Sequence, residues 1–438
     1  MSHQLTRVAL AATALAALVA GDARAQSPVP AAATPAASPE AAAAEEAELA
    51  SQLRELEEDA SRLQLYGFAD FTYTHFLMDS SSRWFDYYFS RYPTFAIGNV
   101  NLYLEKQLAP RWKSLVEFRL LYLPNGTEQT SSTGEVEQTD TRVLDYQDKT
   151  EYLRWGGISI ERAWVEYHAH PLATIRAGQL LTPYGIWNVD HGSPVLISIR
   201  RPFVIGMSLF PKSQTGLELY GTGSLGDSAL TYHLTLSNGR GPVDTYLDLD
   251  YNKALGGRLV LDTPWLDEFK IGASAYTGTY SARTRSYGLR GGAIETDDRL
   301  TEGYRELSLA ADLRARAGPL LLHAEVISQQ VVYDDAARPR TTIDLGQQPD
   351  YFAYGGYVQA AVRLPWFGLM PFASAEYLHP QWRTVPAIMV GGAGINMRVT
   401  PSVTLKTQAQ GAWFPKVENL VIPEEAVTVW EAQVAWVF

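Results

Sequence analysis

The feature that most constrains the fold is a strict alternation of apolar and polar side chains that begins at Leu65 and continues to the end of the chain. In the segment WKSLVEFRLL, Val116 and Phe118 have one parity, and Glu117 and Arg119 have the other. Successive side chains of a β-strand point to opposite faces. Each such segment therefore predicts a strand with one apolar face and one polar or charged face.

Sixteen segments of this kind predict sixteen strands, most of them roughly 10 to 13 residues long, which suits a tilted span of a bilayer better than a soluble sandwich. They lie near residues 65–76, 95–107, 112–123, 157–169, 173–182, 213–222, 228–237, 253–262, 269–280, 304–316, 319–333, 351–364, 370–379, 387–398, 402–414 and 427–438.

The connections between these strands alternate in length. Short turns such as LAPR and VTPS interleave with long polar loops at 124–156, 183–212, 238–252, 281–303 and 334–350. Transmembrane β-barrels have this rhythm, with short turns on the periplasmic side and long loops outside. The sequence predicts an all-β, sixteen-stranded antiparallel barrel over residues 65–438, and a soluble all-β fold is the alternative.

The final segment VWEAQVAWVF explains why closure is expected. Trp430, Val434 and Phe438 share one parity, and Glu431 and Gln433 share the other. A closed barrel leaves no strand edge unpaired in lipid, so the last strand pairs with the first and turns its aromatic face to the bilayer.

Three segments precede the barrel. Residues 1–25 have the charged, apolar and small-residue pattern of a secretory signal peptide, with a transmembrane helix as the alternative. Residues 26–39 are rich in Pro, Ala and Ser and predict a flexible tether. Residues 40–64 are strong helix formers and predict a periplasmic helix that is a candidate coiled coil, or a lone amphipathic helix. A coiled coil would imply a homo-oligomer.

Charge and cysteine content exclude several classes of function. The net charge is −12, so a nucleic-acid partner is not expected. The chain has no cysteine, which fits an exported protein and excludes thiolate metal sites and a disulfide framework.

The polar faces of the strands predict a lumen that carries charges of both signs, because a charge facing lipid costs roughly 2–4 kcal/mol at the midplane. The basic residues on these faces are Lys113, Arg119, Arg162, Arg176, Arg258, Lys270, Arg314, Arg363, Arg398 and Lys406. The acidic ones are Asp70, Glu105, Glu117, Glu166, Glu218, Glu306, Asp312, Glu325, Glu376 and Glu431.

The loop 182–212 is the best candidate for a constriction, because it is long and too apolar to stand in water. The loop contains three basic residues, Arg200, Arg201 and Lys212, and one acidic residue, Asp190. With this excess of positive charge it could form a basic gate. The alternative is a loop packed at the rim with its arginines in water.

No catalytic motif stands out. Gly221, Gly223 and Gly226 satisfy G-x-G-x-x-G, but an alternating strand pattern follows them where a dinucleotide site needs a helix. The sequence predicts no metal, no cofactor and no enzyme. An outer-membrane hydrolase stays open as an alternative, because a catalytic triad is defined by geometry rather than by spacing.

The stretch IERAWVEYHAHPLATIRAGQLLTPYGIWN, from Ile160 to Asn188, together with LYGFADFTYTHF and the terminal VAWVF, resembles the phosphate-selective porin O/P-type family and the related DcaP-type porins. That resemblance implies a trimeric, sixteen-stranded outer-membrane channel for small anions, in some members with a periplasmic coiled coil. It also implies that the third external loop bends into the pore and brings Arg200 and Arg201 toward Arg119, Arg162 or Arg176.

The lumen departs from that family in one respect, because phosphate channels of this kind carry a dense series of basic residues and this one alternates signs. The sequence therefore predicts an outer-membrane porin for small hydrophilic solutes, with a possible preference for anions. Expected partners are polar or anionic solutes, outer-membrane lipid and two further copies of the chain. A structural anchor toward the cell wall is a further alternative.

Overall fold

The computed structural model describes residues 62–78, 92–121, 128–130, 136–138, 157–189, 192–240, 250–290, 293–339, 347–380, 387–415 and 425–438. The predicted signal peptide and tether lie outside these residues. So does the predicted helix at 40–64 apart from its last three residues, of which Gln64 already begins the first strand. Among the described residues, no helix is long and apolar enough to cross a membrane.

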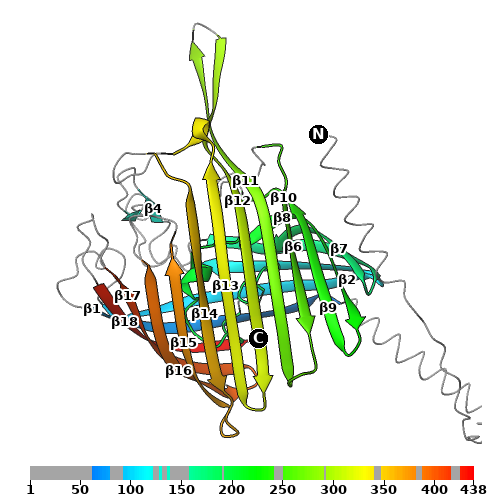
Figure 1. Ribbon diagram of the computed structural model, residues 1–438, viewed down its shortest axis with the longest axis vertical. Helices are drawn as coiled ribbons and strands as arrows, with labels where there is room; N and C mark the ends of the chain where they lie inside the picture. The colour runs from blue at the N-terminus through cyan, green and yellow to red at the C-terminus, as the bar shows by residue number, and fades with distance from the viewer. Residues whose placement is uncertain are drawn as a thin grey trace, which may run out of the picture. The chain divides into compact units, whose positions relative to one another are not determined.

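Sixteen antiparallel strands close into one barrel, as the alternation predicts (Figure 1). They are β1 (Gln64–Met78), β2 (Thr94–Ala109), β3 (Trp112–Leu121), β6 (Gly157–His170), β7 (Ala173–Leu181), β8 (Ser213–Leu225), β9 (Ser228–Ser237), β10 (Ala254–Asp262), β11 (Glu268–Arg290), β12 (Ala293–Ala317), β13 (Leu320–Tyr333), β14 (Tyr351–Val362), β15 (Leu369–His379), β16 (Ile388–Thr400), β17 (Val403–Phe414) and β18 (Glu425–Val437). Each strand pairs with its neighbours in the chain.

The first and last strands seal the barrel. β1 pairs with β18 from Phe68 opposite Val437 to Met78 opposite Val427. Beyond that ladder, the Gly67 amide donates to the Phe438 carbonyl at 2.9 Å, and the Phe438 amide donates to the Gly67 carbonyl at 3.0 Å. The terminal aromatic strand is therefore fully paired, and no edge is left between β1 and β18.

The two faces of the wall differ as the sequence predicts. On β9, Leu234 and Leu236 are exposed on the outer surface, whereas Thr235 and Ser237 are buried inside. On β18, Trp430 and Val434 are exposed, whereas Glu431 and Gln433 are buried. A surface that is apolar outside and polar inside suits a barrel surrounded by lipid.

The prediction of a loop at 281–303 is wrong. β11 and β12 continue as one long hairpin, and their pairing extends to Arg290 opposite Ala293, so that the hairpin projects beyond its neighbours (Figure 1). The sequence of this extension is mostly polar, so the hydrophobic alternation disappears although the backbone stays extended.

Shorter elements lie in the connections. Within the loop 124–156, β4 (Glu128–Thr130) pairs with β5 (Val136–Gln138). A single helical turn, α4 (Phe203–Gly206), lies in the loop between β7 and β8, and a 3-10 turn, η1 (Asp335–Ala337), follows β13.

Candidate pore constriction

The connection between β7 and β8, residues 182–212 and here called the inner loop, folds into the barrel. Its apolar residues Trp187, Val204 and Leu209 are buried and form one cluster with inward-facing residues of β13 to β18, among them Leu378 and Val427. An apolar loop gains by leaving water in this way. The inner loop therefore packs against the inside of the wall, within the lumen and not at the rim.

The inner loop is fixed to the first two strands by polar contacts. The Ser193 hydroxyl donates to the carboxylate of Asp70 on β1, which is itself buried. The Asn99 side chain of β2 donates to Asp70 at 3.0 Å and to Ser193 Oγ at 3.2 Å. Asp70 is thus a buried acceptor that joins the loop to β1 and β2.

On β17, two strands from β1, Lys406 holds the same part of the loop. Its Nζ donates to the carbonyls of Ser193 and Leu196, both at 2.6 Å. Asn396 of β16 donates to the Ile197 carbonyl at 2.8 Å. Lys406 is almost completely buried, so its place is in the attachment of the loop and not on the wet surface of the lumen.

A third attachment lies at the start of the loop, on β10, β12 and β13. Arg258 donates to the carbonyls of Pro183, at 3.0 Å, and Gly185, and also to Asp312 at 2.6 Å. Gly185 has a φ of +70°, and a Cβ there would overlap the carboxylate of Glu325. The loop therefore needs glycine at this position to approach the wall.

Three cations gather around one carboxylate where the inner loop rejoins β8. Glu161 of β6 accepts from Lys212 Nζ at 2.6 Å and from Arg119 Nη1 at 3.2 Å. Arg201 lies within electrostatic reach of both Glu161 and Arg119, and it is exposed. This basic cluster of Arg119, Arg201, Lys212 and Glu161 carries a net formal charge of about +2 when all four groups are ionised.

The cations of the loop repel one another. Burial, together with the charges of Arg119 and Arg201, lowers the pKa of Lys212 below the ordinary lysine value, although Glu161 acts in the opposite direction. Restricted solvation and the charge of Arg119 likewise lower the pKa of Arg201. A guanidinium nonetheless stays protonated in proteins, so Arg201 is a permanent positive charge and Lys212 is a titratable one.

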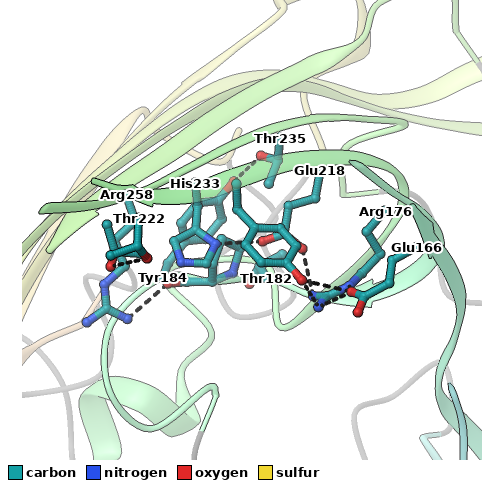
Figure 2. Close-up of polar contacts among 12 residues, drawn as sticks. Glu166, Arg176, Thr182, Tyr184, Glu218, Thr222, His233, Thr235 and Arg258 are labelled. Carbon is teal, nitrogen blue, oxygen red and sulfur yellow. Dashed lines mark hydrogen bonds and ion pairs between the residues drawn. The ribbon is translucent and has the colours of Figure 1, made fainter. Parts of the chain in front are cut away.

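A second set of charges runs along β6 to β9 (Figure 2). The Arg176 guanidinium lies between the rings of Trp164 and Tyr220, at 4.3 and 4.8 Å from their centroids. It donates to Glu166 at 2.8 Å and to Glu218 at 2.9 Å. Aromatic faces and two carboxylates hold this guanidinium in one orientation.

Neighbouring pairs extend this network. The His233 Nδ1 atom lies 2.8 Å from Glu218 Oε1, and Tyr184 of the inner loop shares a hydrogen bond of 2.7 Å with Thr235 (Figure 2). The wall of β6 to β9 and the start of the inner loop are therefore connected through side chains.

Most ion pairs of the lumen share an asymmetry, in that the carboxylate is more deeply buried than its cation; Lys270 with Asp262, near a short turn, is an exception. The side chain of Glu117 is 0% exposed and its partner Arg162 is 22% exposed. The values are 4% for Glu431 and 32% for Arg200. The formal charges balance, but water in the lumen meets mainly the positive partners.

The predicted site residues do not all come together. Arg119, Arg201 and Lys212 come together, whereas Arg200 turns toward β18, where its Nε atom lies 3.0 Å from Glu431. Arg162 and Arg176 lie along the wall in ion pairs, Arg258 and Lys406 attach the inner loop, and Arg398 is exposed near the short turns.

Sequence reasoning missed Glu161. The ladder between β3 and β6 shifts register between Glu117 and Phe118, which pair with Arg162 and Ile160. A β-bulge places two consecutive residues opposite one, so strict alternation misjudges the facing of Glu161. Among the described residues, no group of three or more His, Cys, Asp or Glu side chains could hold a metal ion.

The sequence matches no family model and no curated protein. Several solved structures are similar in shape. The anion-selective porin from Comamonas acidovorans has a TM-score of 0.52 at 10% identity, over 86% of this chain and 99% of that chain. The trimer form of in-vitro folded OmpT, an outer membrane protein of Vibrio cholerae, has a TM-score of 0.51 at 8% identity, over 86% and 99%.

Salmonella typhi OmpF in complex with daunomycin has a TM-score of 0.50 at 12% identity, over 87% of this chain and 99% of that chain. Identities this low carry information about the fold and not about individual residues. The chain has the closed-barrel fold found in these outer-membrane porins.

Proposed function

We propose that this protein is an outer-membrane porin through which small hydrophilic solutes diffuse passively, with a preference for anions. The observation that carries the proposal is the asymmetry of the luminal ion pairs, which leaves their cations facing water and their carboxylates buried. Charges at the wall of a narrow passage select ions of the opposite sign.

The basic cluster supports the same preference at the inner loop. Arg119, Arg201 and Lys212 share the single carboxylate of Glu161, so the positive charge there is not fully compensated. We propose that this cluster borders the narrowest passage. Specificity for phosphate does not follow, because Arg162, Arg176 and Arg258 on the wall are each paired with a carboxylate.

The proposal includes a homotrimer and a periplasmic N-terminal segment. Support for the trimer comes from the fold, since one protein with a similar barrel, OmpT of Vibrio cholerae, is described in a trimer form. Truncating the protein to residues 62–438 and measuring the mass of the resulting oligomer in detergent would test whether residues 1–61 contribute to assembly. A trimer that persists would place assembly in the barrel wall.

A planar bilayer tests the central proposal. Purified full-length protein should give discrete conductance steps, and in a gradient of KCl its reversal potential should show that chloride permeates more readily than potassium. Absence of steps, together with turnover of ester or lipid substrates, would favour the hydrolase alternative. Steps with a cation preference would retain the porin and refute the anion preference.

A further inference from the structure

A separate cavity of about 420 Å³ lies between the inner loop and the wall near the short turns. Pro194, Val195 and Leu196 of the loop form one side, and residues of β15, β16 and β17 form the other. Ligand pockets for small molecules commonly have volumes of about 300–1,000 Å³. The cavity is therefore large enough for a small organic solute, and it is distinct from the basic cluster around Glu161.

Two arginines line this cavity without a counter-ion in the described part of the chain. Arg363 and Arg398 are both exposed, and neither forms an ion pair with a carboxylate of the described residues. Among the residues that the structure describes, no acidic side chain lines the cavity. The lack of an ion-pair partner distinguishes Arg363 and Arg398 from four other arginines that each have a carboxylate partner, namely Arg119, Arg162, Arg176 and Arg200. Unpaired guanidinium groups prefer an anionic ligand, which they can bind through two parallel hydrogen bonds.

The remaining lining is mostly apolar. Pro194, Val195 and Leu196 face the cavity together with Met370, and Val195 is 66% exposed. A hydrated inorganic ion gains nothing from such a surface, whereas a ring or a short chain buries apolar area against it. Asn396 and Thr404 complete the lining with polar side chains.

The loop side of the cavity is held in position before any ligand binds. Lys406 fixes the carbonyls of Ser193 and Leu196, and Asn396 fixes that of Ile197. These contacts lie on both sides of the three apolar loop residues. A ligand would therefore not have to order the loop, which lowers the cost of binding.

From these observations we infer that the cavity is a binding site for small organic acids, in which Arg363 and Arg398 bind the carboxylate and the surface of Pro194, Leu196 and Met370 receives the apolar body. The inference deepens the proposed function, on which it rests, because it names a class of solute and a place where that solute pauses near the periplasmic end of the channel.

Direct binding tests the inference without requiring conductance. The probe is 4-fluorobenzoate, observed by fluorine NMR with purified full-length protein in detergent, and 4-fluorobenzyl alcohol is the neutral control for partition into micelles. The benzoate should show saturable line broadening that the alcohol lacks. The double variant Arg363→Gln/Arg398→Gln should weaken binding at least tenfold, whereas Arg305→Gln, an exposed arginine on β12, should leave it unchanged.

A second variant tests the apolar side. Val195→Asp retains both arginines but adds a carboxylate to an exposed position, and it should also weaken binding of the benzoate. Inorganic phosphate should displace the probe only at more than ten times the concentration that an organic acid needs. Displacement at equal concentration would show a simple anion site and overturn the inference.

Two further outcomes separate this inference from the proposed function. Conductance steps without saturable benzoate binding would overturn the cavity as a site and leave the porin intact. Binding without conductance would refute the porin and retain the site. Retention of each variant's folded barrel is checked by its heat-dependent shift on a gel.

Discussion

Arg162 Nε lies 2.5 Å from Glu117 Oε2 across neighbouring strands, with the carboxylate fully buried and the guanidinium at the water surface. The formal charges of such a pair sum to zero. A permeating ion nevertheless experiences a net positive field, because the guanidinium lies closer to the water than the carboxylate does. The depth of each charge, and not the balance of signs, therefore sets the expected preference of this lumen for anions.

Reversing the charge of Arg201 should reduce that preference. A unit charge about 4 Å from an ion contributes about 1 kcal/mol in water. Arg201→Glu changes the site by two charges, which raises the energy of an anion and lowers that of a cation by about 2 kcal/mol each, so the ratio of anion to cation permeability should fall by more than about tenfold. The measurement is the reversal potential across a salt gradient. Arg305→Glu, on the outer side of β12, is the control, because it makes the same change of charge away from the passage. An equal shift of the reversal potential in both variants would show that Arg201 does not border the passage.

Neutralising Glu161 should act in the opposite direction. Glu161→Gln leaves Arg119, Arg201 and Lys212 without their shared carboxylate, so anion preference should rise severalfold while the side chain keeps its size. The same salt gradient measures the change. Glu105→Gln is the comparison, because Glu105 has a single cation partner, Lys113, near a short turn. A fall in anion preference for Glu161→Gln would contradict the cluster's position.

Anion preference should also decline as the pH rises. Burial lowers the pKa of Lys212, so its positive charge is lost at a pH below the ordinary lysine value of 10.5 and is fully present at lower pH. Reversal potentials recorded from neutral to alkaline pH should show this decline. Lys212→Arg should abolish it, since a guanidinium does not deprotonate in this range; an unchanged profile would assign the titration to another group.

Removing the amine of Lys406 should destabilise the inner loop. Lys406→Met leaves the Ser193 and Leu196 carbonyls without their donor, at a cost of about 1–3 kcal/mol for each buried group. The free energy of unfolding in urea should fall, and open-channel current noise should increase. Lys113→Met, which removes a partly exposed amine, should cost less than about 1 kcal/mol.

The two faces of one strand offer a matched test of membrane insertion. Leu259 is exposed on the outer face of β10, and the adjacent Val260 has the opposite parity. Leu259→Arg should reduce the free energy of unfolding by up to about 2–4 kcal/mol in lipid vesicles. Val260→Arg should cost less, because its charge can reach water in the lumen. Equal costs would contradict a lipid-facing outer surface.

Most of the barrel follows from the sequence, because a buried face and a lipid face impose the same two-residue period on every strand. The period fails where that contrast ends. The extension of β11 and β12 is mostly polar in sequence, so its strands were not predictable from hydrophobicity. The apolar inner residues Ile388, Val390 and Val427 could not be distinguished from outer ones without the inner loop that covers them.

Individual side chains of the candidate site were less predictable. Arg200 and Arg201 are adjacent in the sequence, yet one pairs with Glu431 of β18 and the other faces Arg119 and Glu161. The path of an irregular loop decides this, and no periodicity encodes that path. Lys406 and Arg258 have the parity of lumen residues, but hydrogen bonds to loop carbonyls take them out of the wet surface.

The seam between Gly67 and Phe438 joins positions near opposite ends of the polypeptide. Every other ladder of the barrel joins consecutive barrel strands. The β1–β18 junction therefore has by far the largest sequence separation, and its closure costs the most chain entropy. Its formation can therefore be expected to come last in biogenesis. Until β1 and β18 pair, their unpaired edges can form hydrogen bonds with other chains. An insertion catalyst would therefore have its largest effect if it accelerated the pairing of these two strands.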